Sequence, residues 1–306
     1  MLTDAQKKLL EEIADMTCMP EGAVNIRIDG QKYARQVTEN VLIESKEDMD
    51  GIDIRVKPGT VGETVHIPVV ITESGRKDVV YNDFYIGDGA DITIVAGCGI
   101  HNCGSEDSEH NGIHRFFVGK NAKIKYVEKH YGEGDGNGRR ILNPTTEVYQ
   151  EEGSSVEMEM VQIKGVDSTY RTNLAKLESG SKLVIRERLL THGVQKAVSD
   201  YVVELNGIDS SADVVSRSVA KEDSVQEFNS KIVGNAPCTG HTECDAIIMD
   251  NARVLAVPML DAANVDASLI HEAAIGKIAG EQLIKLMTLG LTEQEAEEQI
   301  VNGFLR

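Results

Sequence analysis

The stretch that decides the fold is Gly89-Ala90-Asp91-Ile92, which continues as ITIVAG over residues 92–97. A turn residue, a small residue and one polar residue lead into an aliphatic strand. The same order recurs at Asn121-Ala122-Lys123-Ile124, Gly153-Ser154-Ser155-Val156, Gly180-Ser181-Lys182-Leu183, Ser211-Ala212-Asp213-Val214 and Asn251-Ala252-Arg253-Val254. The small residues of successive copies are 32, 32, 27, 31 and 40 positions apart. This spacing predicts a solenoid in which one coil carries two or three short strands.

The composition of the region around these copies agrees with strands. From about Val24 to Pro258, short runs of Val, Ile, Thr and Tyr are separated by Gly, Asn and Asp, and no long helical pattern occurs. Such runs are typical of strands. A β-sandwich or barrel would use tight hairpin turns, but apart from the Asn206-Gly207 pair, strong two-residue hairpin signals are scarce. We therefore favour a parallel β-helix over a sandwich.

Helices are predicted at both ends of this β region. Residues 3–17 carry a capping box formed by Thr3 and Gln6. Near the other end, residues 280–289 and 292–302 read as two helices that stop at glycines. We therefore predict a mainly β protein with an N-terminal helical segment (1–23), a parallel β-helix core (24–269) and a C-terminal helical segment (270–306).

The C-terminal helices have more apolar surface than a short hairpin can bury against itself. Either they cap the end of the solenoid or they are presented to another protein. The apolar positions that we expect to bind a partner are Leu283, Ile284, Leu286 and Met287.

Charge and cysteine content narrow the class of protein. The chain of 306 residues has a formal net charge of −19, which disfavours nucleic acids and anionic membranes as partners. Its five cysteines are irregularly spaced, and the sequence shows neither a signal peptide nor a long apolar run. These features indicate a cytoplasmic protein with reduced thiols.

Candidate metal or sulfur ligands gather between Gly234 and Glu272. Cys238, His241 and Cys244 are spaced as Cys-x-x-His-x-x-Cys, and His271 follows after one more strand-like segment and turn. This set could hold a soft metal or a sulfur species, although it has too few cysteines to hold a cluster permanently. The alternatives are structural: a buried small thiol, a core histidine and a carboxylate at a helix start.

Two further stretches are predicted to be loops. Residues 97–115 contain Cys98, His101 and Cys103, which could accept sulfur or bind a second metal. Residues 130–140 are rich in glycine but acidic, and no helix follows them, so they do not form a phosphate cradle. The chain also lacks a Gly-x-x-x-x-Gly-Lys-[Ser/Thr] motif, so we expect no nucleotide site in it.

The last quarter of the chain resembles a known family. TECDAIIMDN (242–251), Pro258 and IHEAAIGKIAGEQLIKLMTLGLTEQEAEEQIVNGF (270–304) are similar to the C-terminal core of the SufB/SufD family, scaffolds of SUF iron–sulfur cluster assembly. The resemblance implies a right-handed parallel β-helix flanked by helices and a role that is not catalytic. It also implies that Cys244, His271 and Glu272 bind a nascent, transient iron–sulfur cluster.

The same resemblance implies partners. The helices from about Gly276 would dock a SufC-like ABC ATPase, and a sulfur donor and apo-protein acceptors would visit the scaffold. The chain is shorter than typical SufB and has Ile270 where SufB often carries a carboxylate. It combines features of both paralogues, so we expect a homodimer, or a heterodimer with a paralogue, in which Cys244 and His271 of two chains supply four ligands. The sequence does not indicate whether a flavin takes part.

Two other classes of function stay open at this point. One is an interaction or adaptor protein whose cysteines are incidental. The other is a β-helix hydrolase or lyase acting on polysaccharide, which the absence of Trp disfavours.

Overall fold

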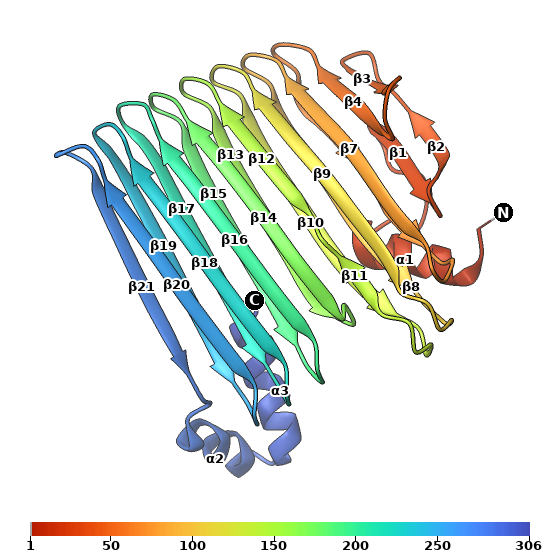
Figure 1. Ribbon diagram of the computed structural model, residues 1–306, viewed down its shortest axis with the longest axis vertical. Helices are drawn as coiled ribbons and strands as arrows, with labels where there is room; N and C mark the ends of the chain where they lie inside the picture. Colours follow the sequence, from red (N-terminus) through yellow and green to blue (C-terminus); the bar gives the residue numbers. More distant parts are fainter. Residues whose placement is uncertain (1) are drawn as a thin grey trace.

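The repeats form a flattened parallel β-solenoid, described by a computed structural model over residues 2–306. Each coil contributes one strand to each of two sheets, and the sheets lie face to face, as Figure 1 shows. The first sheet contains β1 (Ala23–Ile28), β2 (Gln31–Gln36), β5 (Val61–His66), β6 (Val69–Ile71), β8 (Asp91–His101), β10 (Lys123–Glu133), β13 (Ser155–Lys164), β15 (Lys182–Thr191), β17 (Ser210–Ala220), β19 (Cys238–Ile248) and β21 (Ser268–Gly276).

The second sheet contains β3 (Val41–Ser45), β4 (Gly51–Val56), β7 (Lys77–Ile86), β9 (Ser108–Val118), β11 (Arg140–Leu142), β12 (Thr145–Gln150), β14 (Ser168–Leu177), β16 (Lys196–Leu205), β18 (Val225–Gly234) and β20 (Arg253–Ala262). The predicted fold class, a mainly β solenoid with helices at both ends, is therefore confirmed.

The strand register confirms four copies of the repeat and corrects two. Ala90, Ala122, Ser154 and Ser181 precede paired strands of the first sheet and form one buried column. The column continues through Ser210, Cys238 and Ala267. Ala212 instead lies two positions further along β17, and Ala252 precedes β20 in the second sheet. The prediction misaligned Ala252 because turns of the second sheet use the same order of residue types, and Ala212 because it follows two other small residues, Ser210 and Ser211.

The core lies between the sheets, where alternate residues of every strand point inward. Most of these positions are aliphatic, and Phe84 and Phe116 stack there with their ring centroids 4.3 Å apart. Polar and charged side chains also point inward in the middle coils, among them Glu128, Arg171 and Glu187. A strand buried on one face explains the alternating pattern of the sequence.

The N-terminal helix α1 (Asp4–Ala14) packs on the outer face of β8. Its predicted capping box between Thr3 and Gln6 is present. A Cβ atom at Gly97 would overlap the carbonyl oxygen of Ile13, and one at Gly99 would touch Leu9. The glycines around Cys98 therefore allow a helix to approach the sheet closely.

The two predicted loops were too long. Residues 97–101 belong to β8 and residues 108–115 to β9, so the connection covers only residues 102–107. Likewise, residues 130–133 end β10, and the next connection covers residues 134–139. Several glycines and acidic residues that suggested loops are accommodated in strands because their neighbours on the adjacent coils complete the parallel ladder.

The solenoid ends in a coil whose inner face is open. Residues 270–276, which the sequence placed in the C-terminal helical segment, continue strand β21. The helices α2 (Gly280–Thr288) and α3 (Glu293–Phe304) follow and lie beside the lower ends of the last strands in Figure 1. Gly290, with φ of +100°, separates them as predicted, whereas Gly303 lies inside α3.

The C-terminal helices leave this coil uncovered. Helix α2 has no buried residue, and the inward-facing Leu260 of β20 and Ile275 of β21 are 38% and 39% exposed. Across residues 2–306, no helix combines the length and apolar character that a membrane crossing requires.

Candidate functional site

Cys244 lies inside the solenoid near its open end. It is 1% exposed and points inward from β19, in a column that contains Glu187 of β15 and Ser216 of β17. Burial, together with the nearby charges of Glu187 and Asp245, raises the pKa of the Cys244 thiol to about 12. The thiol is therefore protonated at neutral pH in the isolated chain, so metal binding there must displace a proton.

His271 shares the inner face with Cys244, but the two residues are not directly opposite. In the parallel pairing of β19 and β21, His271 lies beside Thr242, and the residue beside Cys244 is Ala273. Thr242 is fully buried, which fixes the inward direction of His271, while the Nδ1 atom of His271 is buried without a hydrogen-bond partner. Ala273 is exposed although it too faces inward, because no further coil follows. The structure thus places a free imidazole nitrogen on the last strand and a buried thiol one strand further inside, on the same inner face.

The pleat of β19 separates the predicted Cys-x-x-His-x-x-Cys ligands. Cys238 and Cys244 are buried and inward, whereas His241, three residues from each, is on the outer face. Six residues of strand separate the two cysteines by about 20 Å. These three side chains therefore do not converge on one metal ion.

Glu272 lies on the opposite face of β21 from His271 and joins a different group. The possible ligand atoms of His241, Glu243 and Glu272 all lie within 4.8 Å of one another. Among residues 2–306, it is the one group of at least three His, Cys, Asp or Glu side chains whose ligand atoms are this close together. Glu272 pairs with Glu243 across the ladder, and its carboxylate is 3.7 Å from His241 Nε2.

Hydrogen bonds from the neighbouring coil orient this outer group. A carboxylate oxygen of Asp213 lies 2.8 Å from His241 Nδ1, and the other lies 2.8 Å from the Arg186 guanidinium. Burial would raise the pKa of Asp213, but His241 and Arg186 together hold this pKa below its usual range. A carboxylate on Nδ1 leaves Nε2 free for a metal ion. A hydrogen bond with Asp245, together with burial, raises the pKa of Glu243. One imidazole and two carboxylates are donors suited to divalent first-row metal ions.

Cys98 and Cys103 occupy the first full coils, at the other end of the solenoid. Cys98 points inward and is buried, and burial raises the pKa of its thiol well above the usual value. Cys103 is exposed in the connection after β8, where its sulfur lies 3.0 Å from His101 Nε2. The two cysteines therefore face different environments although five residues separate them.

The charged interior between these ends was not predicted from the sequence. Arg171 of β14 forms an ion pair with Glu128 of β10 and lies 3.7 Å from Glu187. Burial alone would raise the pKa of Glu128, but the Arg171 guanidinium holds it well below the usual range. Hydroxyl groups of Ser199, Tyr201 and Ser216 donate to Glu187. The available signal was a charged residue in the same alternation as apolar ones, such as Glu187 after Leu183 and Ile185, which marks a buried charge only once the facing of the strand is known.

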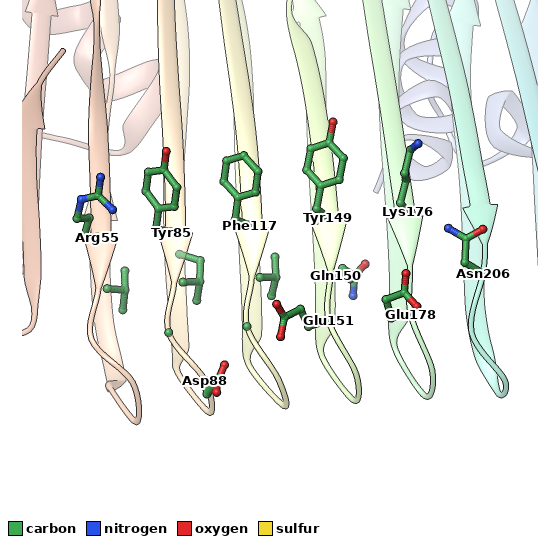
Figure 2. Close-up of a pocket in the computed structure, with 15 residues that line it drawn as sticks. Arg55, Tyr85, Asp88, Phe117, Tyr149, Gln150, Glu151, Lys176, Glu178 and Asn206 are labelled. Atoms are coloured by element: carbon green, nitrogen blue, oxygen red, sulfur yellow. The ribbon is translucent and has the colours of Figure 1, made fainter. Parts of the chain in front are cut away.

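A hollow of about 540 Å³ lies on the outer face of the second sheet, and no predicted site residue lines it. Figure 2 shows Arg55, Tyr85, Phe117 and Tyr149 in a row across successive strands. The rings stack on one another 5.1 and 5.4 Å apart, and the Arg55 guanidinium covers Tyr85. Since the ring faces are occupied by their neighbours, this row is explained as a stabilising cross-strand ladder.

Comparisons with known proteins give a consistent result. Residues 71–304 match the family model for the SUF system FeS cluster assembly, SufBD core domain. The chain is 31% identical over 277 residues to an iron–sulfur cluster assembly SufBD family protein of Methanocaldococcus jannaschii, covering 88% of this chain and 86% of that one. It is 30% identical over 264 residues to such a protein of Archaeoglobus fulgidus, covering 85% and 69%. Over 104 residues it is 36% identical to the iron–sulfur cluster assembly protein SufB of Bacillus subtilis, covering 32% and 22%.

Proposed function

Because this chain belongs to the SufB/SufD family of SUF iron–sulfur cluster assembly proteins, we propose that it is a scaffold that holds a nascent cluster at a dimer interface and couples to an ABC-type ATPase. The proposal is carried by one observation. A buried thiol, Cys244, and an unpartnered imidazole nitrogen, that of His271, share the interior face at the open end of the solenoid.

The number of donors explains why two chains are needed. Stable iron–sulfur clusters are held by four ligands, commonly cysteine thiolates. One chain offers one thiol and one imidazole on the inner face of its last two first-sheet strands, so a two-fold axis through the last coil would bring the total to four. A site shared between chains can also be opened by moving them apart, which suits a scaffold that must release its cargo.

The surface of the last coil supports such an interface. Strands β20 and β21 are the edge strands of their sheets, so each has one unpaired side. On the outer face of β20 the apolar side chains of Leu255, Val257 and Met259 are 54%, 43% and 53% exposed. A row of this kind at a sheet edge is typical of a surface covered by another chain.

The outer group of His241, Glu243 and Glu272 fits the iron side of the same process. It lies on β19 and β21, the strands that carry Cys244 and His271, but on the other face. We place Glu272 in this group, where it would bind ferrous iron as cargo before cluster formation. Carboxylate and imidazole donors bind a divalent ion less tightly than thiolates bind a cluster, which favours onward transfer.

The C-terminal helices supply a surface for the ATPase. Ile284 is 63% exposed and Met287 is 42% exposed, while Leu283 and Leu286 of the same helix are half-buried. This exposed apolar ridge favours a protein partner over the alternative role as a cap. Movement of two bound ATPases would be transmitted to the last coil through β21, which leads directly into α2.

Anaerobic reconstitution with iron and sulfide tests the proposal. The intact chain should gain charge-transfer absorbance, and Cys244→Ala and His271→Ala should lose it. Cys18→Ala is the matched control, since Cys18 is an exposed thiol outside the site. Absence of absorbance in the intact chain, or an unaffected Cys244→Ala variant, would instead favour an adaptor protein. Co-purification with the ATPase should disappear when residues 280–306 are deleted.

A further inference from the structure

A hollow of about 430 Å³ lies on the outer face of the first sheet, beside the group of His241, Glu243 and Glu272. His241 and Glu243 line it from β19, and side chains of β13, β15 and β17, most of them charged, line the rest. Arg188 of β15 and Arg217 of β17 are among these. The hollow therefore brings a candidate metal group together with two guanidinium groups.

The two arginines lie directly opposite each other in the parallel pairing of β15 and β17. Like charges in this position repel each other across the ladder and destabilise the strand pair. Asp245 lies opposite Arg217 on the other side, but it is hydrogen-bonded to Glu243. Of the arginines on these strands, Arg186 and Arg188 form ion pairs, whereas the Arg217 side chain has no ion pair or hydrogen bond among residues 2–306.

Nearby carboxylates do not neutralise the arginine pair. Glu159 of β13 lies 3.2 Å from the Lys125 ammonium group but 3.8 Å from Arg188, so the lysine is its closer partner. Asp213 is held by two other partners, each 2.8 Å away. The guanidinium groups of Arg188 and Arg217 therefore have no close carboxylate of their own, and an anion bound between them would remove their repulsion.

The arginine pair also lies within reach of the metal group. In the pairing of β17 and β19, Val215 lies opposite Glu243, and Arg217 is the next residue on the same face of β17. Diagonal neighbours of this kind in a sheet are about 7–8 Å apart, a distance that a long side chain crosses. One small ligand can therefore contact an arginine and a metal ion on Glu243 at the same time.

The chemistry of the two groups defines the ligand. A guanidinium group binds a carboxylate through two parallel hydrogen bonds, so two adjacent groups suit a ligand with several carboxylates. The metal group offers one imidazole and two carboxylates, and a divalent first-row ion on three such ligands keeps open coordination positions. Oxygen atoms of the same ligand can fill these positions.

We propose that the hollow binds divalent iron as its complex with a small polycarboxylate such as citrate; this ligand class rests on the proposed role of the outer group as an iron site. His241, Glu243 and Glu272 hold the metal ion, and Arg188 and Arg217 hold a free carboxylate of the ligand. The iron cargo thus arrives together with its carrier ligand. The arginines distinguish this complex from a hydrated divalent ion, which has no carboxylate to offer.

Equilibrium dialysis of the full chain with radiolabelled citrate tests the proposal, with Mn²⁺ in place of Fe²⁺. The intact chain should retain citrate when Mn²⁺ is present. Arg188→Gln and Arg217→Gln should each weaken this retention by about tenfold or more, because charge-assisted hydrogen bonds are lost. Both variants should bind Mn²⁺ alone no less tightly than the intact chain, since a nearby positive charge is removed. Arg139→Gln, which removes an exposed arginine outside the hollow, is the control.

Several outcomes would overturn the proposal. Citrate could simply withdraw Mn²⁺ from the protein, which electron paramagnetic resonance would detect, or it could be retained equally well by Arg217→Gln. Retention of phosphate in place of citrate would refute the polycarboxylate. If the intact chain binds neither Mn²⁺ alone nor Mn²⁺ with citrate, the outer group fails as an iron site as well. Mn²⁺ binding without citrate retention counts against this proposal alone, and cluster reconstitution at Cys244 and His271 is unaffected by either result.

Discussion

The Nδ1 atom of His241 lies 2.8 Å from a carboxylate oxygen of Asp213, one coil earlier in the solenoid. This contact directs the other ring nitrogen towards Glu243 and Glu272 on the outer face of the last strands. Asp213, which orients the His241 ring, thus belongs to an earlier coil than the three side chains that would bind the ion.

The first prediction concerns this outer group. The intact chain should bind Mn²⁺, used as a spectroscopic substitute for Fe²⁺, and His241→Ala and Glu272→Gln should abolish binding. Asp213→Asn should weaken it about 10- to 100-fold, because the histidine loses its orientation. Electron paramagnetic resonance of the unbound ion measures all of these. Asp261→Asn, an exposed carboxylate on β20, is the control, and Cys244→Ala should leave Mn²⁺ binding unchanged.

The second prediction concerns the dimer. Val257→Asp places a charge in the exposed apolar row of β20 and should convert a dimer into monomers. Val194→Asp is the control, because Val194 is 88% exposed in a turn away from the last coil. Light scattering coupled to size-exclusion chromatography measures the mass of each. A Val257→Asp variant that remains dimeric would place the interface elsewhere.

The third prediction concerns the buried ion pair. Arg171→Met leaves the carboxylates of Glu128 and Glu187 inside the solenoid without their cation, and should lower the free energy of unfolding by about 3–5 kcal/mol. Arg139→Met removes a pair with Asp107 on the surface, where water screens the charges, and should lower the free energy of unfolding far less. Urea denaturation with an unchanged m-value measures both effects. Similar costs for the two variants would contradict the structural role of the interior charges.

The fourth prediction concerns acid stability. Burial lowers the pKa of His114 from 6.5 to about 4, so the folded state favours the neutral ring. Below pH 6.5 the His114 ring is protonated in the unfolded state before it is protonated in the folded state. The free energy of unfolding should therefore be highest above pH 6.5 and fall by up to about 3 kcal/mol as the pH decreases towards 4. His114→Gln should flatten the stability profile between these pH values, whereas the exposed His192→Gln should not. Chemical denaturation at a series of pH values measures the slope.

The fifth prediction concerns the docking of α1. Gly97→Ala places a methyl group against the carbonyl oxygen of Ile13 and should displace the helix, at a cost of about 1–3 kcal/mol. Gly276→Ala is the control, since a Cβ atom there meets nothing within 4 Å. Faster proteolysis of the N-terminal segment in Gly97→Ala would report the displacement, and equal rates in both variants would contradict it.

The fold could be predicted from the sequence because its determinants are local and repeated. The turn order around Ala90, Ala122 and Ser154 recurs with each coil, and the capping boxes at Thr3 and Thr292 involve residues three positions apart. The last two copies were misaligned because Ser210, Ser211 and Ala212 are small residues in a row and because the turn at Ala252, in the second sheet, uses the same order of residue types. The true member of the column, Cys238, was interpreted as a possible ligand instead of a small core residue.

The candidate site was harder to predict because it depends on facing and register. Spacing along the chain suggested that His241 belongs with Cys244, and sequence adjacency suggested that Glu272 belongs with His271. The pleat separates both pairs and creates a group with Glu243, which carried no motif. Asp213 is 28 residues from its histidine and becomes its neighbour only through the stacking of coils.

The position of the last coil has a consequence for its motion. Every inner coil is hydrogen-bonded on two sides, whereas β20 and β21 are held from one side. In a linear array of this kind the terminal unit unfolds at the lowest free-energy cost, while the other coils stay folded. Transient fraying of this one turn would let solvent and reagents reach Cys244, and pairing with a second molecule would suppress it. Deuterium uptake that is fastest in residues 253–276 and slows on association would be its signature.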